Sequence, residues 1–139
     1  MLASEIDLAP LRRALGWLTE GLMLWRAQAE GSILKPHLRS AVIQSFEFCY
    51  ELSLRSLRRV LIERAAAADR IADLSFNELL RHAADAALIS DPVAWRSWRE
   101  LRNATSHAYD EVKAQRVAEQ AELFAADAAE LLAALERSL

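Results

Sequence analysis

The chain has 139 residues, of which 53% are hydrophobic and 27% are charged, and its formal net charge is −3. This length fits one domain, and the apolar share is large enough for a core, which excludes a disordered chain. Only three Gly and three Pro are present, so collagen-like and low-complexity chains are excluded as well. We expect a single domain over residues 1–139.

The numbers of cysteines and histidines and the lengths of the apolar segments exclude further classes of protein. The single Cys49 cannot form an internal disulfide, which favours a reducing compartment. His37, His82 and His107 are scattered along the chain, so we expect no metal site and no cofactor. The N-terminus is acidic where a signal peptide needs bases, and no apolar stretch approaches the ~18 residues of a membrane span. The sequence therefore predicts a soluble, cytoplasmic protein.

The first predicted helix begins after Asp7 and ends before Gly31-Ser32. Asp7 is expected to cap this helix, with Pro10 in its first turn. Apolar residues recur at steps of three and four, which places them on one face of the helix. These residues are Leu8, Leu11, Leu15, Leu18, Leu22 and Trp25.

The second predicted helix begins near Pro36 and ends at about Ala68. Its apolar face comprises Ile43, Phe46, Tyr50, Leu54, Leu57 and Leu61. A polar stripe follows the same spacing and comprises Gln44, Glu47, Glu51, Arg55 and Arg58. A helix that is apolar around most of its circumference, with one stripe that bears carboxylates, is expected at the centre of a bundle.

Capping signals predict three further helices. A capping box at Ser75-Phe76-Asn77-Glu78 opens a short helix that ends near Ile89. Asp91-Pro92 combines an N-cap with a proline at the first helical position, which starts a fourth helix. The last helix runs from about Asp110 to the end of the chain. Together the segments predict an all-α fold, an antiparallel four-helix bundle with one additional short helix.

The fourth predicted helix carries an arginine on its apolar side. Trp95 and Trp98 share a face, and at 100° per residue Arg102 projects between them. An arginine in this place is costly to desolvate unless it is paired or lines a cleft. Two explanations remain open: an ion pair with Glu47 or Glu51 of the second helix, or a functional cleft. In either case we expect at least one of these carboxylates to contact and orient the guanidinium.

A histidine and a tyrosine follow this arginine closely. Arg102 and His107 would point about 140° apart on an unbroken helix. Thr105 and Ser106 compete for backbone hydrogen bonds, and a break there would let Arg102, His107 and Tyr109 converge. Such a set suits phosphate chemistry. Two structural alternatives also remain: a histidine that caps a helix end, and a half-buried tyrosine whose hydroxyl bonds a neighbour.

The pattern Arg102-x4-His107-x-Tyr109 resembles the motif of the HEPN-domain family. The segment Ala41–Leu52 and the tryptophan-containing fourth helix resemble the subfamily labelled nucleotidyltransferase substrate-binding protein, which includes the HepT-like ribonuclease toxins. This likeness extends over about residues 38–110, in the same order along the chain. It implies a helical bundle that forms a homodimer, in which two copies of the motif meet at one groove.

The resemblance implies a metal-independent endoribonuclease, the toxin of a HEPN/MNT toxin–antitoxin pair. In this reaction the RNA 2′-hydroxyl attacks the adjacent phosphate. His107 would transfer the proton, since histidine titrates near neutral pH, and Arg102 would stabilise the phosphorane charge. Asn103 and Ser106 are expected to hydrogen-bond the substrate or the two catalytic residues.

The resemblance also implies a control mechanism through Tyr109. In this subfamily a partner, the minimal nucleotidyltransferase antitoxin, silences the ribonuclease by attaching AMP to the motif tyrosine (AMPylation). For this reaction the Tyr109 hydroxyl must be accessible beside Arg102 and His107. The older subfamily label implies an alternative, a non-catalytic subunit that presents a substrate to the nucleotidyltransferase. A third possibility is a bundle with a purely structural role in dimerisation.

Overall fold

The computed structural model describes residues 6–65 and 68–139, and every regular element within them is helical. The helices are α1 (Ala9–Ala27), α2 (Leu34–Arg64), α3 (Ala68–Ala72), α4 (Phe76–Asp85), α5 (Pro92–Ala104) and α6 (Glu111–Ser138), and the 3₁₀ turn η1 (Thr105–His107) joins α5 to α6. The predicted all-α class is confirmed. None of these helices has the length and apolar character needed to cross a membrane. The N-terminal residues 1–5, on which the expectation of no signal peptide depends, lie outside the described ranges.

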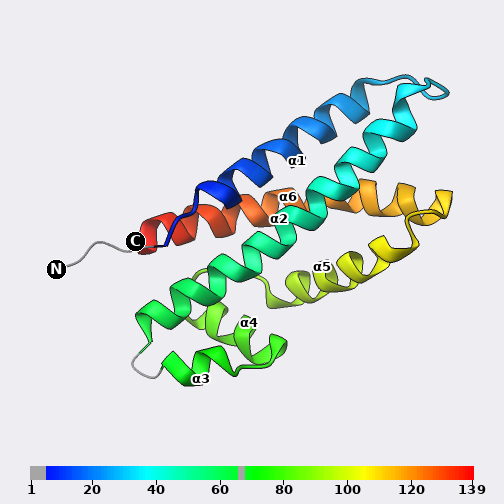
Figure 1. Ribbon diagram of the computed structural model, residues 1–139. Helices are drawn as coiled ribbons and strands as arrows, with labels where there is room; N and C mark the ends of the chain where they lie inside the picture. The colour runs from blue at the N-terminus through cyan, green and yellow to red at the C-terminus, as the bar shows by residue number, and fades with distance from the viewer. Residues whose placement is uncertain (1–5, 66–67) are drawn as a thin grey trace.

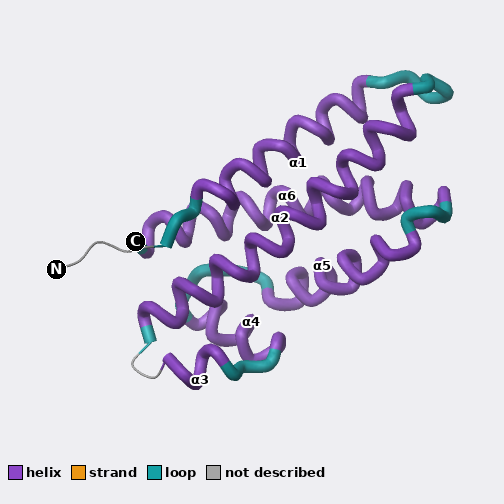
Figure 2. The backbone as a smooth tube through the Cα atoms, in the orientation of Figure 1, coloured by secondary structure: helices purple, strands orange, loops and turns teal. Residues whose placement is uncertain are grey.

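Four long helices form the antiparallel bundle (Figure 1). Helices α1 and α5 run in one direction, and α2 and α6 run in the other. Helix α2 contacts both α1 and α6, as expected for the central helix. The short helices α3 and α4 are inserted between α2 and α5, and the tube view shows them beside the end of α2 (Figure 2). The α1–α2 loop and the α5–η1–α6 junction lie together at the opposite end of the bundle.

Aromatic side chains hold the middle of the core. The Phe124 ring of α6 meets the rings of Phe46, Trp95 and Trp98 edge to face, with centroids 5.0, 5.8 and 5.8 Å away. Edge-to-face pairs add to the free energy gained from burying these rings. The core therefore ties α2, α5 and α6 together just behind the motif. Cys49 is fully buried in the same core, and burial raises the pKa of its thiol to about 12.

The predicted helix starts are confirmed by hydrogen bonds. Ser75 Oγ accepts from the Glu78 backbone N–H at 3.3 Å, and Asp91 Oδ1 accepts from Ala94 at 3.1 Å. Asp7 Oδ1 accepts from the Ala9 N–H at 2.9 Å, although Leu8 is the residue at the N-cap itself. Each acceptor satisfies a donor that the first turn of a helix leaves free.

The prediction for the end of the second helix is wrong. It placed the end at about Ala68, whereas α2 ends at Arg64, residues 66–67 are outside the described ranges, and α3 begins at Ala68. The alanines between Arg64 and Asp69 favour helix and carry no stop signal. Tertiary contacts define α3 instead, because Ile71 is buried and Arg58 Nη1 donates to its carbonyl at 2.9 Å.

The prediction for the end of the helix that follows Ser75 is also wrong. It placed the end near Ile89, whereas this helix, α4, ends at Asp85. The helix stops through a Schellman arrangement, in which Leu88 N–H donates to Ala83 O and Ala87 N–H donates to Ala84 O. Ala87 adopts a φ of 60°. Glycine is usual at this position, so the sequence carried no signal for the turn.

Replacing Ala87 by glycine should stabilise the protein, because an L-residue with a side chain is strained at positive φ. We expect Ala87→Gly to raise the free energy of unfolding by about 0.5–1 kcal/mol in urea denaturation. The matched control is Ala86→Gly, since Ala86 has a φ of −85° and gains nothing from glycine. Equal effects of the two substitutions would contradict the assignment of strain.

Candidate functional site

The position of α5 is set by its tryptophans. Trp95 and Trp98 are 2% and 7% exposed, and Trp98 Nε1 donates to Asp127 Oδ2 of α6 at 2.8 Å. Burial raises the pKa of the Asp127 carboxyl, and the Trp98 hydrogen bond partly offsets this shift. The apolar face of α5 is thereby held against α6, which leaves Arg102 at the boundary with α2.

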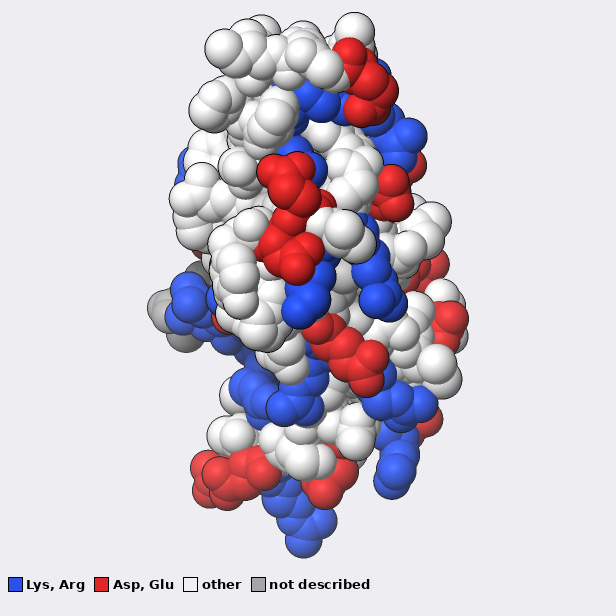
Figure 3. Space-filling model, turned by 90° about the vertical axis from the view of Figure 1, so that its right-hand side faces the viewer, with Lys and Arg blue, Asp and Glu red and all other residues white. Residues whose placement is uncertain are grey.

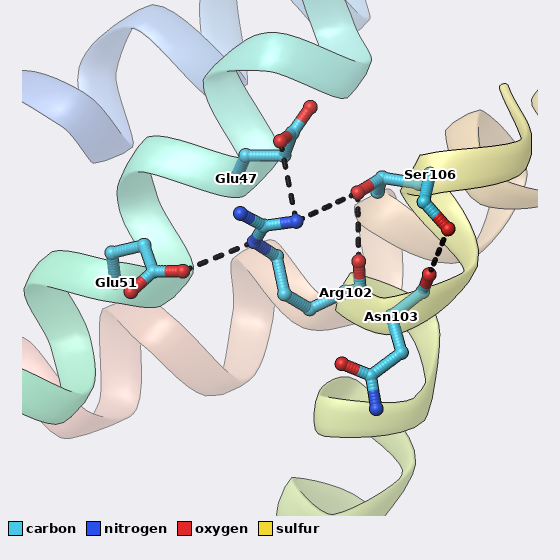
Figure 4. A network of polar contacts seen from close by, with 6 residues as sticks. Glu47, Glu51, Arg102, Asn103 and Ser106 are labelled. Carbon is cyan, nitrogen blue, oxygen red and sulfur yellow. Dashed lines mark hydrogen bonds and ion pairs between the residues drawn. The ribbon is translucent and has the colours of Figure 1, made fainter.

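The guanidinium of Arg102 is held by two carboxylates of α2 (Figure 4) and by a hydroxyl of the turn η1. Its Nη1 lies 3.3 Å from Glu47 Oε2, and its Nε lies 3.1 Å from Glu51 Oε1. Nη1 also donates to Thr105 Oγ1 at 2.9 Å. The predicted contact between Arg102 and the carboxylates of the second helix is confirmed, and both carboxylates take part.

These contacts leave one edge of the guanidinium free. Three of its five N–H donors face Glu47, Glu51 and Thr105. In the described part of the chain, Nη2 has no partner. The side chain as a whole is 33% exposed. A phosphate oxygen is a suitable acceptor for such a fixed, charged donor pair.

The predicted break after α5 is confirmed. The Thr105 hydroxyl donates to the Arg102 carbonyl at 2.7 Å, and the Ser106 hydroxyl donates to the Asn103 carbonyl at 2.9 Å. Such bonds compete with the next α-helical turn, and the chain continues as the 3₁₀ turn η1. Asp110 then caps α6 through the backbone N–H groups of Val112 and Lys113.

His107 and Tyr109 emerge side by side from this turn. Their ring centroids are 6.1 Å apart, and Tyr109 is 85% exposed. The alternative of a half-buried tyrosine is therefore wrong. The predicted exposure of Tyr109 beside His107 is confirmed, whereas its expected place beside Arg102 is not found. His107 is also exposed, and no hydrogen bond of its side chain to a helix end is found in the described residues, so the ring does not act as a helix cap.

His107 lines a groove of about 470 Å³ between α5 and α6. Ser97 and Ala104 of α5 also line this groove, and they lie roughly 140–160° around the helix from Arg102. The groove therefore opens on the side of α5 away from the Arg102 ion pairs. The predicted convergence of Arg102, His107 and Tyr109 within one chain is not found: no contact within residues 6–65 and 68–139 joins Arg102 to either ring.

The two other predicted site residues, Asn103 and Ser106, make no side-chain contact with Arg102 in the described part of the chain. The hydroxyl of Ser106 is engaged in the turn, and the amide of Asn103 is directed away from the guanidinium (Figure 4). The prediction overlooked Lys113 and Arg116, which line the groove with His107. Their spacing on the first turns of the last helix was available in the sequence, but nothing there indicated which helix they would face.

Two general features of the site bear on its chemistry. Basic and acidic side chains alternate over the end of the molecule at which the motif lies, so this face has no continuous patch of one sign (Figure 3). Groups of three or more His, Cys, Asp and Glu side chains that could hold a metal are absent from the described residues.

The fold and the site define an all-helical protein of the HEPN type, with the arginine of its motif clamped and its tyrosine exposed. A family model described as "Nucleotidyltransferase substrate binding protein like" matches residues 6–137, and the chain belongs to this family. It is 40% identical over 106 residues to a Haemophilus influenzae protein named "Probable ribonuclease HepT", which covers 76% of this chain and 73% of that protein. A solved Haemophilus influenzae structure, described as a substrate-binding domain of a nucleotidyltransferase, superposes with a TM-score of 0.86 and 34% identity over 94% of this chain and 99% of that one.

Proposed function

We propose that this protein is a metal-independent endoribonuclease that acts in the cytoplasm as the toxin of a toxin–antitoxin pair. The observation that carries the proposal is the clamped Arg102, which offers two free N–H donors from a fixed position. The relative named as a probable ribonuclease supports the same activity.

The proposed reaction is an internal transfer within the RNA. His107 accepts the proton of a 2′-hydroxyl, whose oxygen forms a bond to the adjacent phosphorus. The bond from phosphorus to the 5′-oxygen breaks, and the His107 of a second copy of the chain protonates the leaving oxygen. The products are a 2′,3′-cyclic phosphate and a 5′-hydroxyl. Arg102 stabilises the negative charge that grows on the phosphorane.

We propose a homodimer, which the chemistry and the geometry of one chain support. The reaction needs an acid and a base, while one chain supplies one motif histidine, on the far side of α5 from the Arg102 ion pairs. In a homodimer, a second copy of the chain would bring its own Arg102 and His107 close to those of the first copy. We expect sedimentation velocity to show a dimer at micromolar concentration, and cross-links between two copies of the motif. A monomer, or motifs on opposite outer faces of a dimer, would contradict the shared site.

Glu47 and Glu51 are proposed as positioning residues for Arg102. Partly exposed ion pairs contribute about 0.2–1 kcal/mol each to stability, so Glu47→Ala should remain folded. We expect its kcat to fall about 10- to 100-fold because the guanidinium loses its orientation, with KM little changed. Glu47→Gln keeps an acceptor oxygen at the same position and should restore most of kcat. If Glu47→Ala and Glu47→Gln lose equal activity, or neither loses any, Glu47 does not position Arg102.

Control is proposed to come from a cognate nucleotidyltransferase that attaches AMP to Tyr109. The family description points to a nucleotidyltransferase as partner. The Tyr109 ring contacts the His107 ring, and Tyr109 is exposed, so its hydroxyl is a suitable acceptor for the nucleotide. The adenylate would place bulk and negative charge beside the groove and so repel RNA.

A second candidate function is a non-catalytic subunit that presents a substrate to the nucleotidyltransferase. The description of the similar Haemophilus structure favours it. Expression of this chain alone in a bacterial host separates the two functions. A ribonuclease toxin arrests growth, and Arg102→Ala or His107→Ala relieves the arrest at equal protein levels. A substrate-binding subunit has no effect on growth in either form.

A further inference from the structure

The groove beside His107 contains two cations that the proposed reaction has not used. Lys113 and Arg116, one helical turn apart on α6, line it with His107, and its floor is apolar, formed by Trp98, Leu101 and Val117. The groove holds about 470 Å³, which is in the range of small-ligand sites. It is therefore large enough for part of an extended ligand that reaches His107.

Both cations are free to bind. In residues 6–65 and 68–139, the side chains of Lys113 and Arg116 form no ion pair and no hydrogen bond, although both are exposed. Lys35, by contrast, caps the end of α1 by donating to the Trp25 and Gln28 carbonyls. Arg39 is paired with Glu111 at 3.3 Å.

The charges that line the groove are mainly positive. Glu100 is the single acidic residue among those that line it, against Lys113 and Arg116. Asp110 already accepts from the first backbone N–H groups of α6, so an anion in the groove would be bound by the two side chains and not by the helix end.

We propose that this α5–α6 groove binds the nucleotide next to the cleaved bond in single-stranded RNA. Lys113 and Arg116 each hold one backbone phosphate, on either side of this nucleotide, and the apolar floor contacts the sugar or base. In this proposal the two cations are positioning residues that act on binding, whereas Arg102 and His107 act on the reacting atoms. This inference rests on the proposed ribonuclease function, because His107 marks where the cleaved bond would lie.

Binding of an RNA that cannot react tests the groove directly. A fluorescent 2′-O-methyl RNA lacks the attacking hydroxyl, and its affinity for the full-length chain is measured by anisotropy from 0.1 to 1 M salt. Two phosphate contacts contribute about 1.4 to the slope of log affinity against log salt. We expect Lys113→Gln/Arg116→Gln to lower the slope by about that amount, which corresponds to roughly 25-fold weaker binding at 0.1 M salt.

The control is Arg13→Gln/Arg96→Gln, which removes the same charge from two exposed arginines outside the groove. It should keep the wild-type slope. With cleavable RNA, the groove variant should raise KM while kcat stays within about threefold. If both double variants bind alike, the groove assignment is overturned while the ribonuclease proposal stands.

Two other outcomes also overturn the groove assignment. Wild-type protein that neither binds nor cleaves RNA would remove the proposed function together with the groove. A groove variant that keeps its RNA affinity but loses binding to the nucleotidyltransferase would identify the groove as a protein-docking surface instead.

Discussion

Alanine at Arg102 or at His107 should reduce RNA cleavage to background while the protein stays folded. Loss of a general acid–base group costs about 10²–10⁴-fold in rate, and loss of a charged donor to the transition state costs about 10²–10³-fold. Both side chains are at least partly exposed, so neither substitution opens a cavity in the core. The kcat measured on a defined RNA, together with circular dichroism melting, checks the prediction.

Matched controls make this test specific. His82→Ala and Arg96→Ala replace exposed residues of the same types outside the groove and outside the Arg102 ion pairs, and both should cleave at the wild-type rate. Chelators should leave all rates unchanged. Full activity in Arg102→Ala or His107→Ala would remove the proposed mechanism.

Incubation with the cognate nucleotidyltransferase, ATP and Mg²⁺ should add adenylate mass to this chain at Tyr109 and abolish its ribonuclease activity. The Mg²⁺ serves the phosphoryl transfer by the partner. Tyr109→Phe keeps the ring and loses the acceptor oxygen, so it should cleave RNA normally and escape silencing. Intact-mass and peptide mass spectrometry, run beside the cleavage assay, measure both effects.

The second tyrosine is an internal control. Tyr50 is 5% exposed, and burial raises the pKa of its hydroxyl to about 12, although the charges of Arg99 and Arg102 partly offset the shift. It should therefore remain unmodified in the wild type and in Tyr109→Phe. Adenylate on any residue other than Tyr109, or complete silencing of Tyr109→Phe, would refute this control scheme and leave the nuclease proposal intact.

The bundle and the ion pairs of Arg102 could be predicted from the sequence, because both depend on the spacing of residues along single helices. Apolar steps of three and four placed Leu11, Leu18 and Phe46 in the core, and all three are fully buried. The same spacing placed Glu47 and Glu51 on one face of the central helix, so a contact with Arg102 could be expected once that arginine was seen among tryptophans.

The remainder depends on tertiary contacts that carry no local signal. Helix α3 follows an alanine run and is held by Arg58 and Ile71, and Ala87 adopts a turn conformation in which glycine is usual. The break at Thr105 was predicted, but the direction in which it turns His107 was not. The turn directs His107 toward α6, where Lys113 and Arg116 form the groove with it.

The most direct test of the ribonuclease assignment is the chemistry of the RNA ends left by the purified chain in EDTA. Attack by the 2′-hydroxyl predicts fragments that carry a 2′,3′-cyclic phosphate and a 5′-hydroxyl, which mass spectrometry distinguishes from hydrolytic ends. The Arg102→Ala protein, purified in parallel, should leave the same RNA intact. RNA that stays whole with folded wild-type protein, or ends with a 3′-hydroxyl and a 5′-phosphate, would contradict the account.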